Sequence, residues 1–268
     1  MYKIRHDQEK SLKIKILVVT HKPYWMPQDT IYLPICVGNR MRDMQITSDR
    51  SGDNIGDKNP DYCELTGMYW AWKNLKADYV GLAHYRRHFT VKKYVWSLEK
   101  RKKIVLTNEE LMPILANTDI ILPAKRKYYI ETNKSHYNHA HQPVWLKETG
   151  NIIKKHYPDY EAAFKLVCDR RWAHMFNMFI MRKNYFDAYC EWLFSVLFML
   201  ENNVKNSGIK AEPRLYGFVS ELLLDVWIEK NKIHYAEVGF IFMERQNWIK
   251  KIFEFLKRKA VPKFGRIK

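Results

Sequence analysis

The sequence has no hydrophobic run long enough to cross a membrane. Its longest nearly apolar stretch, residues 192–200, has nine residues and is interrupted by Ser195, whereas a spanning helix needs about 20 apolar residues. Near the N-terminus, residues 16–19 form an apolar stretch of only four, which is shorter than the core of a signal peptide. We therefore expect neither a membrane span nor export.

Glycine, proline and cysteine are also scarce. Ten Gly and ten Pro among 268 residues exclude a collagen-like or linker-rich architecture. No two cysteines form a CxxC pair, so the sequence predicts neither a zinc knuckle nor a disulfide framework. We expect reduced, mostly buried thiols and a cytoplasmic protein. The cysteines are Cys36, Cys63, Cys168 and Cys190.

Acidic residues are few relative to basic ones. The 46 Lys and Arg exceed the 29 Asp and Glu, which gives a formal net charge of +17, and 15% of residues are aromatic. This composition can bury a core and excludes a disordered chain. An excess of positive charge favours an anionic partner. One alternative is a nucleic-acid-binding protein that stacks bases on aromatic rings, but no recognised binding motif is present, and the aromatic residues fall largely at buried helix positions.

Short apolar segments alternate with amphipathic ones, which predicts an α/β fold. Residues 13–21 place four consecutive apolar residues between polar flanks, as in a buried parallel strand. Residues 22–59 are rich in Pro and polar residues and are predicted to form a long, ordered loop, and Asn59 is predicted to cap a helix. The other predicted elements are strands at 78–83, 119–123 and 176–181, and helices at 184–200 and 217–229.

The chain is long for one simple domain and short for two. We expect a catalytic domain over residues 1–245 and a separate tail over residues 246–268. From Glu244 to Lys268 there are nine Lys or Arg and two Glu, and apolar residues recur at helical spacing. Such a basic amphipathic helix can lie in an anionic membrane interface, or it can dock on the domain with a solvated basic face.

The block His84-Tyr85-Arg86-Arg87-His88 follows a predicted strand. Ligands of open α/β sheets lie beyond the carboxyl ends of the strands. Arg guanidinium groups bind phosphate oxygens bidentately, and imidazolium adds donors, so this block suits a diphosphate leaving group. No DxD triplet follows the strand, which favours cationic side chains in place of a bound metal. The alternative is that the two arginines form surface salt bridges.

A second cluster comprises His136, His139 and His141. In an extended segment His139 and His141 would point the same way, so a zinc site is geometrically possible, as in a metal hydrolase. The spacing matches no standard zinc motif, and we favour hydrogen bonding to a hydroxyl-rich acceptor, with ordinary structural histidines as the alternative.

A glycosyl transfer that inverts the anomeric centre needs one base for the acceptor hydroxyl proton. The candidates are Asp53, Asp57, Glu64 and Glu221. Glu221 lies near the start of a predicted helix and could point into a cleft. Helix periodicity alone favours a solvent-facing residue that shares a polar face with Asp225.

Four blocks together resemble a known family: HKPYWMP (21–27), GDNIGDKNPDYCELTGMYWAWKN (52–74), YVGLAHYRRHF (79–89) and RLYGFVSELLLDVW (214–227). The chain is similar to glycosyltransferases of bacterial capsule, exopolysaccharide and O-antigen gene clusters, a family long labelled a domain of unknown function. The segments SHYNHAH and FNMFIM fit the same family. One departure is Leu222, where Arg is expected after the Glu.

The resemblance implies a GT-A-like, Rossmann-like central sheet flanked by helices, and a hexosyltransferase that is inverting and independent of metal. Its donor would be a UDP-sugar, with UDP-galactofuranose the leading candidate. The acceptor would be a lipid-linked saccharide or a polysaccharide. The protein would then lie in the cytoplasm on the inner face of the plasma membrane, with its tail on anionic lipid and with no nucleic-acid partner and no cofactor.

The resemblance also assigns roles by position. Glu221 would be the catalytic base. Apart from the resemblance, Asp57 is a second catalytic candidate among the carboxylates. The donor site would comprise Thr20, His21, Lys22, Tyr62, Glu64, His84, Tyr85, Arg86 and Arg87. The acceptor site would comprise His136, His139, His141 and Asn177.

Overall fold

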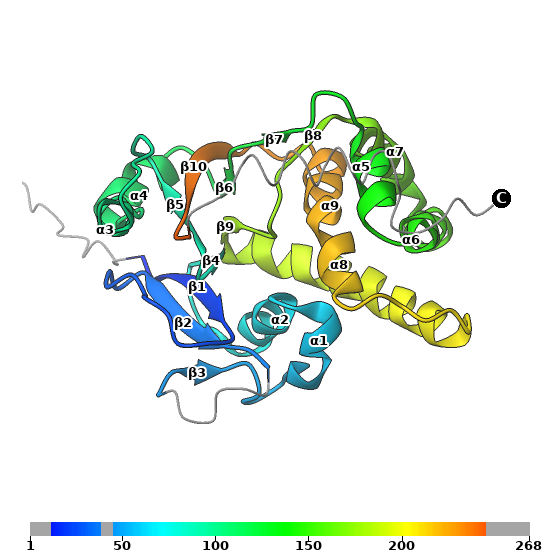
Figure 1. The fold of residues 1–268 in the computed structure, drawn as a ribbon, viewed down its shortest axis with the longest axis horizontal. Coiled ribbons are helices and arrows are strands. Elements are labelled where there is room, and N and C mark those ends of the chain that lie inside the picture. The colour runs from blue at the N-terminus through cyan, green and yellow to red at the C-terminus, as the bar shows by residue number, and fades with distance from the viewer. Residues whose placement is uncertain (1–11, 39–44, 245–268) are drawn as a thin grey trace, which may run out of the picture.

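The structure is a computed structural model and describes residues 12–38 and 45–244. Strands and helices alternate along most of it (Figure 1). The strands are β1 (Ile14–Thr20), β2 (Tyr32–Cys36), β3 (Thr47–Ser48), β4 (Tyr79–His84), β5 (Arg87–Thr90), β6 (Ile120–Pro123), β7 (Arg126–Lys127), β8 (Trp172–Ala173), β9 (Phe179–Arg182) and β10 (Ala236–Phe242). The α-helices are α1 (Asn59–Tyr62), α2 (Leu65–Asn74), α3 (Leu98–Lys102), α4 (Asn108–Leu115), α5 (Asn133–Ala140), α6 (Pro143–His156), α7 (Glu161–Asp169), α8 (Lys183–Asn206) and α9 (Leu215–Lys230), and 3-10 turns occur at η1 (Gly56–Lys58) and η2 (Pro158–Tyr160).

The main sheet is mixed, with strand order β3-β2-β1-β4-β5-β10-β6-β9. The strands β3, β2, β1 and β4 run parallel, whereas β5 and β9 run antiparallel to β4. Because β4 pairs with both β5 and β9, the strands β4, β5, β10, β6 and β9 close into a small five-stranded barrel. The broad α/β prediction is confirmed, and the small barrel is a feature that the sequence did not predict.

Alternate residues of the strands face two cores. Leu17 and Val19 of β1 join one large cluster with helices α2 and α6 to α9, while Ile16 and Val18 join a second cluster beside α4. In Figure 1, α5, α6, α7 and α9 gather at one end of the molecule, and α3 and α4 lie at the other end beside β5 and β10. Near the carboxyl end of β1, Gly67 of α2 packs beside Val19, and Gly217 near the start of α9 packs beside Cys63 after α1.

Several predicted elements match the structure. The strands expected at 13–21, 78–83 and 119–123 correspond to β1, β4 and β6, and the two late helices correspond to α8 and α9. The predicted loop at 22–59 is wrong, because it contains β2 and β3. Pro34 lies within β2 opposite Val18 of β1, and it has no partner on β3. The N–H that proline lacks therefore costs no hydrogen bond to β3.

The predicted start of helix α1 is shifted by one residue. Lys58 is the N-cap and Asn59 is the first helical residue, with Pro60 in the first turn, where proline fits because the missing N–H has no helical partner. The predicted tail at 246–268 lies outside the described residues. Within 12–38 and 45–244, no helix is long and apolar enough to cross a membrane.

Candidate active site

The β4–β5 turn meets the end of β1 at one edge of the sheet. Val19 of β1 pairs with His84 of β4. The residues that follow these two strands therefore lie side by side. The ring of Tyr85 lies 5.4 Å from the His21 ring and 5.2 Å from Lys22 Nζ. The structure thus brings together the two segments that the sequence predicted for donor binding, residues 20–22 and 84–87.

His84 is a neutral imidazole in this cluster. Burial, and then the charges of Arg87 and Arg86, lower the pKa of His84 to about 2. The backbone N–H of Arg86 donates to His84 Nδ1 at 3.3 Å, so the ring proton belongs on Nε2. The lowered pKa favours a neutral His84, so we expect the positive charge of the block to come from the guanidinium groups.

Arg86 and Arg87 are both half-buried. The Arg87 guanidinium stacks 4.2 Å from the ring centre of Phe176, and the Nε of each arginine is buried without a hydrogen-bond partner among the described residues. Arg86 pairs with Glu244 at 3.6 Å. Burial lowers the pKa of Arg87, and the Glu221 carboxylate partly offsets this effect. Two adjacent, partly desolvated cations are unfavourable unless an anion compensates them, so the cluster suits an anionic ligand.

A second cluster joins the α1–α2 junction to β9 and α9. Asn177 is 2% exposed, and its Nδ2 donates to Glu64 Oε1 at 2.8 Å and to the Gly217 carbonyl at 3.3 Å. Ser220 Oγ in turn donates to Asn177 Oδ1 at 3.0 Å. A Cβ at Gly217 would lie 3.2 Å from Cys63 Sγ, so a small residue there lets α9 approach the α1–α2 junction. Asn177, predicted as an acceptor contact, instead holds these segments together.

Backbone strain concentrates in the same place. Among the described residues six non-glycine residues have positive φ, and Cys63, Phe176, Asn177 and Arg214 are four of them. Arg214 Nε donates to Cys63 Sγ at 3.2 Å, and Asn177 contacts both Glu64 and α9. Strained backbone of this kind costs free energy and is typical of functional sites. Phe176 and Asn177 also explain why β9 starts at Phe179, later than predicted.

Glu221 lies in the second turn of α9 and is half-buried, and its charge interacts with those of Arg87, Arg126 and Arg214. Burial raises the pKa of Glu221 to about 7, and the Glu64 carboxylate raises it further, while Arg87, Arg126 and Arg214 oppose the rise. Among the described residues Glu221 makes no ion pair, although its charge interacts with that of Arg87. A carboxyl group with a pKa near neutrality can exchange a proton at physiological pH.

The histidine segment is helical, so the extended conformation that a zinc site with His139 and His141 would need is not present. In α5, His136 and His139 are one turn apart and both contact the buried Glu131 carboxylate, at 3.2 Å and 2.7 Å from their Nδ1 atoms. His141 caps the end of α5, contacts Glu212 at 3.2 Å and stacks on Phe218. The three histidines therefore do not converge, and no group of three or more His, Cys, Asp or Glu in the described chain could hold a metal ion.

Two predicted site residues lie elsewhere. Tyr62 is 1% exposed, and its hydroxyl donates to Glu201 at 3.0 Å, so its side chain belongs to the core. Asp57 is exposed and pairs with Arg50 at 2.8 Å, outside the Glu221 cluster. Asp225 does not share a solvent face with Glu221, because it is buried and accepts a hydrogen bond from the backbone N–H of His174.

The sequence matches a known protein family. A family model described as "Domain of unknown function (DUF4422)" matches residues 15–232. The chain belongs to this family. It is also similar to a solved structure titled as the apo form of WbbM, a bifunctional glycosyltransferase, with 32% identity and a TM-score of 0.77. The match covers 87% of this chain and 46% of that one, so the chain spans about half the length of WbbM. No curated protein matches the sequence.

Two residues that interact electrostatically with Glu221, Arg126 and Tyr128, were not predicted from the sequence. Both lie within the segment that matches DUF4422. The Glu221 charge helps to raise the pKa of Tyr128 to about 12, after burial as the main cause. The Tyr128 hydroxyl is buried without a hydrogen-bond partner among the described residues, and its ring lies 4.2 Å from that of His136. Tyr128 therefore connects the Glu221 cluster to α5. No local sequence signal marks it, because its position depends on the pairing of β7 with β8.

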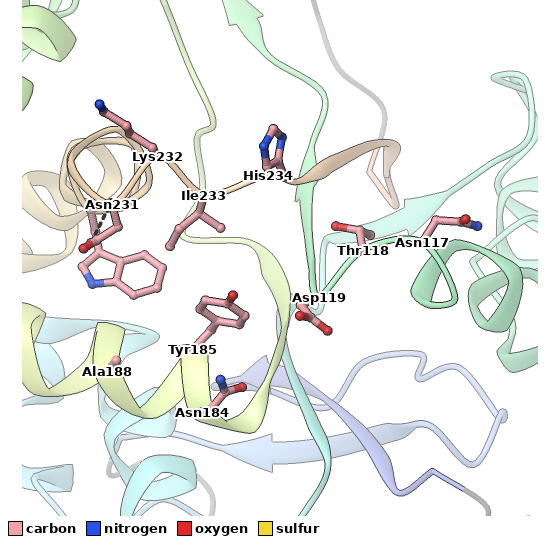
Figure 2. A pocket seen from close by; sticks show the side chains of 11 residues that line it. Asn117, Thr118, Asp119, Asn184, Tyr185, Ala188, Asn231, Lys232, Ile233 and His234 are labelled. Carbon is pink, nitrogen blue, oxygen red and sulfur yellow. Dashed lines mark hydrogen bonds between the residues drawn. The ribbon is translucent and has the colours of Figure 1, made fainter.

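A cavity of about 570 Å³ lies at the other end of α9 (Figure 2). Figure 2 shows Asp119, Tyr185 and Ile233 around it. Glu221 and Asn231 are ten residues apart on and just after the helix, which corresponds to about 15 Å along its axis. This DUF4422 chain thus has a cavity that is separate from the arginine–Glu221 cluster.

Proposed function

We propose that the protein is a glycosyltransferase that moves a sugar from a nucleotide-diphosphate donor to an acceptor hydroxyl. The similarity to WbbM supports this proposal. The observation that carries it is the position of Glu221, whose pKa is raised to about 7, beside the partly buried cation Arg87. A base that can take a proton and a cation that can stabilise an anionic leaving group are the two functions that glycosyl transfer to a hydroxyl requires.

In the proposed reaction the acceptor hydroxyl oxygen attacks the anomeric carbon. The bond between that carbon and the diphosphate oxygen breaks, and its electron pair stays with the nucleoside diphosphate. Glu221 takes the hydroxyl proton. Arg86 and Arg87 stabilise the charge that develops on the diphosphate, since guanidinium groups bind phosphate oxygens bidentately. These steps invert the anomeric centre.

The donor would contact the edge formed by β1 and the β4–β5 turn. Lys22 Nζ lies over the rings of Tyr85 and Tyr24, at 5.2 Å and 5.7 Å, which places a third positive charge near Arg86. Thr20 is fully buried, and its hydroxyl donates to the Lys22 carbonyl, so we assign it to the support of this segment. UDP-galactofuranose is the leading donor candidate, and the fold would be of the GT-A-like type.

The acceptor would approach from α5. Glu131 orients His136 and His139 from one side, and Tyr128 links that helix to Glu221. Imidazole nitrogens can hydrogen-bond sugar hydroxyl groups. We propose a lipid-linked saccharide or a growing polysaccharide as acceptor, and a reaction that needs no metal because the arginines supply the positive charge.

A screen of UDP-sugars for thermal stabilisation tests the proposal. A ligand that binds the folded chain raises the melting temperature. We expect stabilisation by UDP and by one UDP-sugar, and release of UDP from that sugar when a suitable acceptor is added. If no nucleotide sugar raised the melting temperature, the result would contradict the proposal.

A further inference from the structure

The segment between β5 and α3 exposes large apolar side chains. Val91, Tyr94, Trp96 and Leu98 are 48%, 51%, 83% and 42% exposed. They fall within eight consecutive residues, and the rings of Tyr94 and Trp96 lie 5.6 Å apart. We call residues 91–103, which include α3, the 91–103 surface. Exposed apolar patches on folded proteins commonly mark interaction sites.

The same surface is strongly basic. It carries five lysines that are exposed or half-exposed and one acid, Glu99, so the net charge at the surface is 5 − 1 = +4, without the buried Arg101. Lys92 pairs with Glu110, and Lys102 pairs with Glu99. Three exposed lysines of this surface make no ion pair among the described residues: Lys93, Lys100 and Lys103.

A buried arginine fixes the shape of this segment. Arg101 is 2% exposed, and its guanidinium donates to the carbonyls of Val95 at 2.9 Å and Trp96 at 3.1 Å, and to the Tyr94 hydroxyl. It also donates to the Phe242 carbonyl at 2.8 Å, which ties the segment to the end of β10. The ordered backbone therefore holds the Trp96 ring outward, where nothing in the described chain covers it.

We propose that the 91–103 surface docks on an anionic lipid bilayer. Trp and Tyr rings lie preferentially at the level of lipid headgroups, aliphatic side chains enter the acyl boundary, and lysines are attracted to anionic headgroups. The lysines and the exposed apolar side chains alternate within one short segment, so both are available to this mode of binding. A protein partner fits less well, because lysine is depleted in protein interfaces. Single-stranded nucleic acid would use the aromatic rings but gains nothing from Val91 and Leu98.

This inference does not depend on the proposed function, but it bears on it. Val91 lies four residues after Arg87 along β5, which corresponds to about 13 Å. Docking would therefore bring the arginine cluster close to the lipid surface. A lipid-linked acceptor would be within reach there.

Vesicle binding by the full chain tests the inference. Vesicles with and without phosphatidylglycerol are titrated with wild type, Trp96→Ala and a Lys93→Gln/Lys100→Gln/Lys103→Gln variant. At low ionic strength we expect about tenfold weaker binding for Trp96→Ala and about 100-fold weaker binding for the triple variant, since each lysine near the surface contributes about fivefold. Matched controls that should bind like wild type are Tyr129→Ala, which removes a 74% exposed ring elsewhere, and Lys147→Gln/Lys155→Gln/Lys210→Gln.

A second measurement separates this surface from the basic tail. Brominated lipids quench tryptophans that enter the bilayer, and the chain has nine tryptophans, including Trp248 in the tail. We expect Trp96→Phe to lose much of the quenching seen in wild type. Equal quenching in both proteins, or wild-type vesicle binding by Trp96→Ala and the lysine variant, would overturn the inference.

Two other results would also overturn it. One is a dimer, seen by analytical ultracentrifugation, that Trp96→Ala dissociates while vesicle binding is retained. The other is loss of polyuridylate binding in Trp96→Ala with unchanged vesicle binding.

Discussion

Replacing Glu221 by Gln should raise stability and abolish activity at the same time. The pKa of Glu221 is about 7 in the folded chain, against an ordinary value of 4.5. Between these two values the unfolded chain loses this proton before the folded chain does, so the stability of wild type falls as pH rises. Above pH 7 the full difference of 2.5 pH units corresponds to an upper limit of about 3 kcal/mol. Glutamine has the same shape without the charge and removes this cost.

The measurement is the melting temperature of wild type and Glu221→Gln from pH 5 to pH 8. We expect similar stability near pH 5 and a melting temperature several degrees higher for the variant at pH 8, at about 2–4 °C per kcal/mol for a chain of this size. Glu191→Gln is the matched control, because Glu191 is an exposed residue of α8 and should show no such pH dependence. In the same preparations, transfer by Glu221→Gln should fall by 10²–10⁴-fold, while UDP still stabilises it. Equal melting curves at pH 8 together with full transfer would refute the assignment of Glu221 as a partly buried base with a raised pKa.

The remaining predictions concern the arginines, the helix contact and metal dependence. Arg87→Ala should reduce turnover of the donor by at least 10²-fold while the circular dichroism spectrum is unchanged. The control Asp57→Asn, which alters an exposed ion pair, should keep wild-type turnover. Full turnover in Arg87→Ala and a loss in Asp57→Asn would contradict the proposed site. Gly217→Val should destabilise the chain by about 1–3 kcal/mol in denaturant titrations, because a Cβ alone already lies 3.2 Å from Cys63 Sγ, and unchanged stability would show that α9 does not pack closely there. Turnover should persist in excess EDTA, and inhibition that manganese reverses would show that a metal takes part.

The sequence was most informative where a short apolar run is bounded by polar residues. β1, β4 and β6 are such strands, and the register of Val19 with His84 follows from two parallel neighbours. The proximity of residues 20–22 to residues 84–87 could therefore be predicted. Closure of the barrel could not, because it depends on long-range pairing of β4 with β9.

Local structure was least predictable where polar residues form a regular helix. The helix around His136 and His139 has few apolar residues to show a helical period, and its start depends on a hydrogen bond from the Ser135 N–H to the Thr132 hydroxyl. The exposure of Asp225 was wrongly predicted, because the charge gave no sign of its buried partner His174. The raised pKa of Glu221 also has no local signal, since it arises from burial and from the Glu64 carboxylate, which lies far away in the sequence.

The central claim is that Arg86 and Arg87 bind the diphosphate of the donor. Calorimetric titration of UDP and of uridine into wild type and an Arg86→Ala/Arg87→Ala variant tests it directly, because the two ligands differ only in the phosphates. The account predicts that the variant binds UDP at least 100-fold more weakly than wild type does, while any affinity for uridine is unchanged. Equal affinity of both proteins for UDP would contradict it.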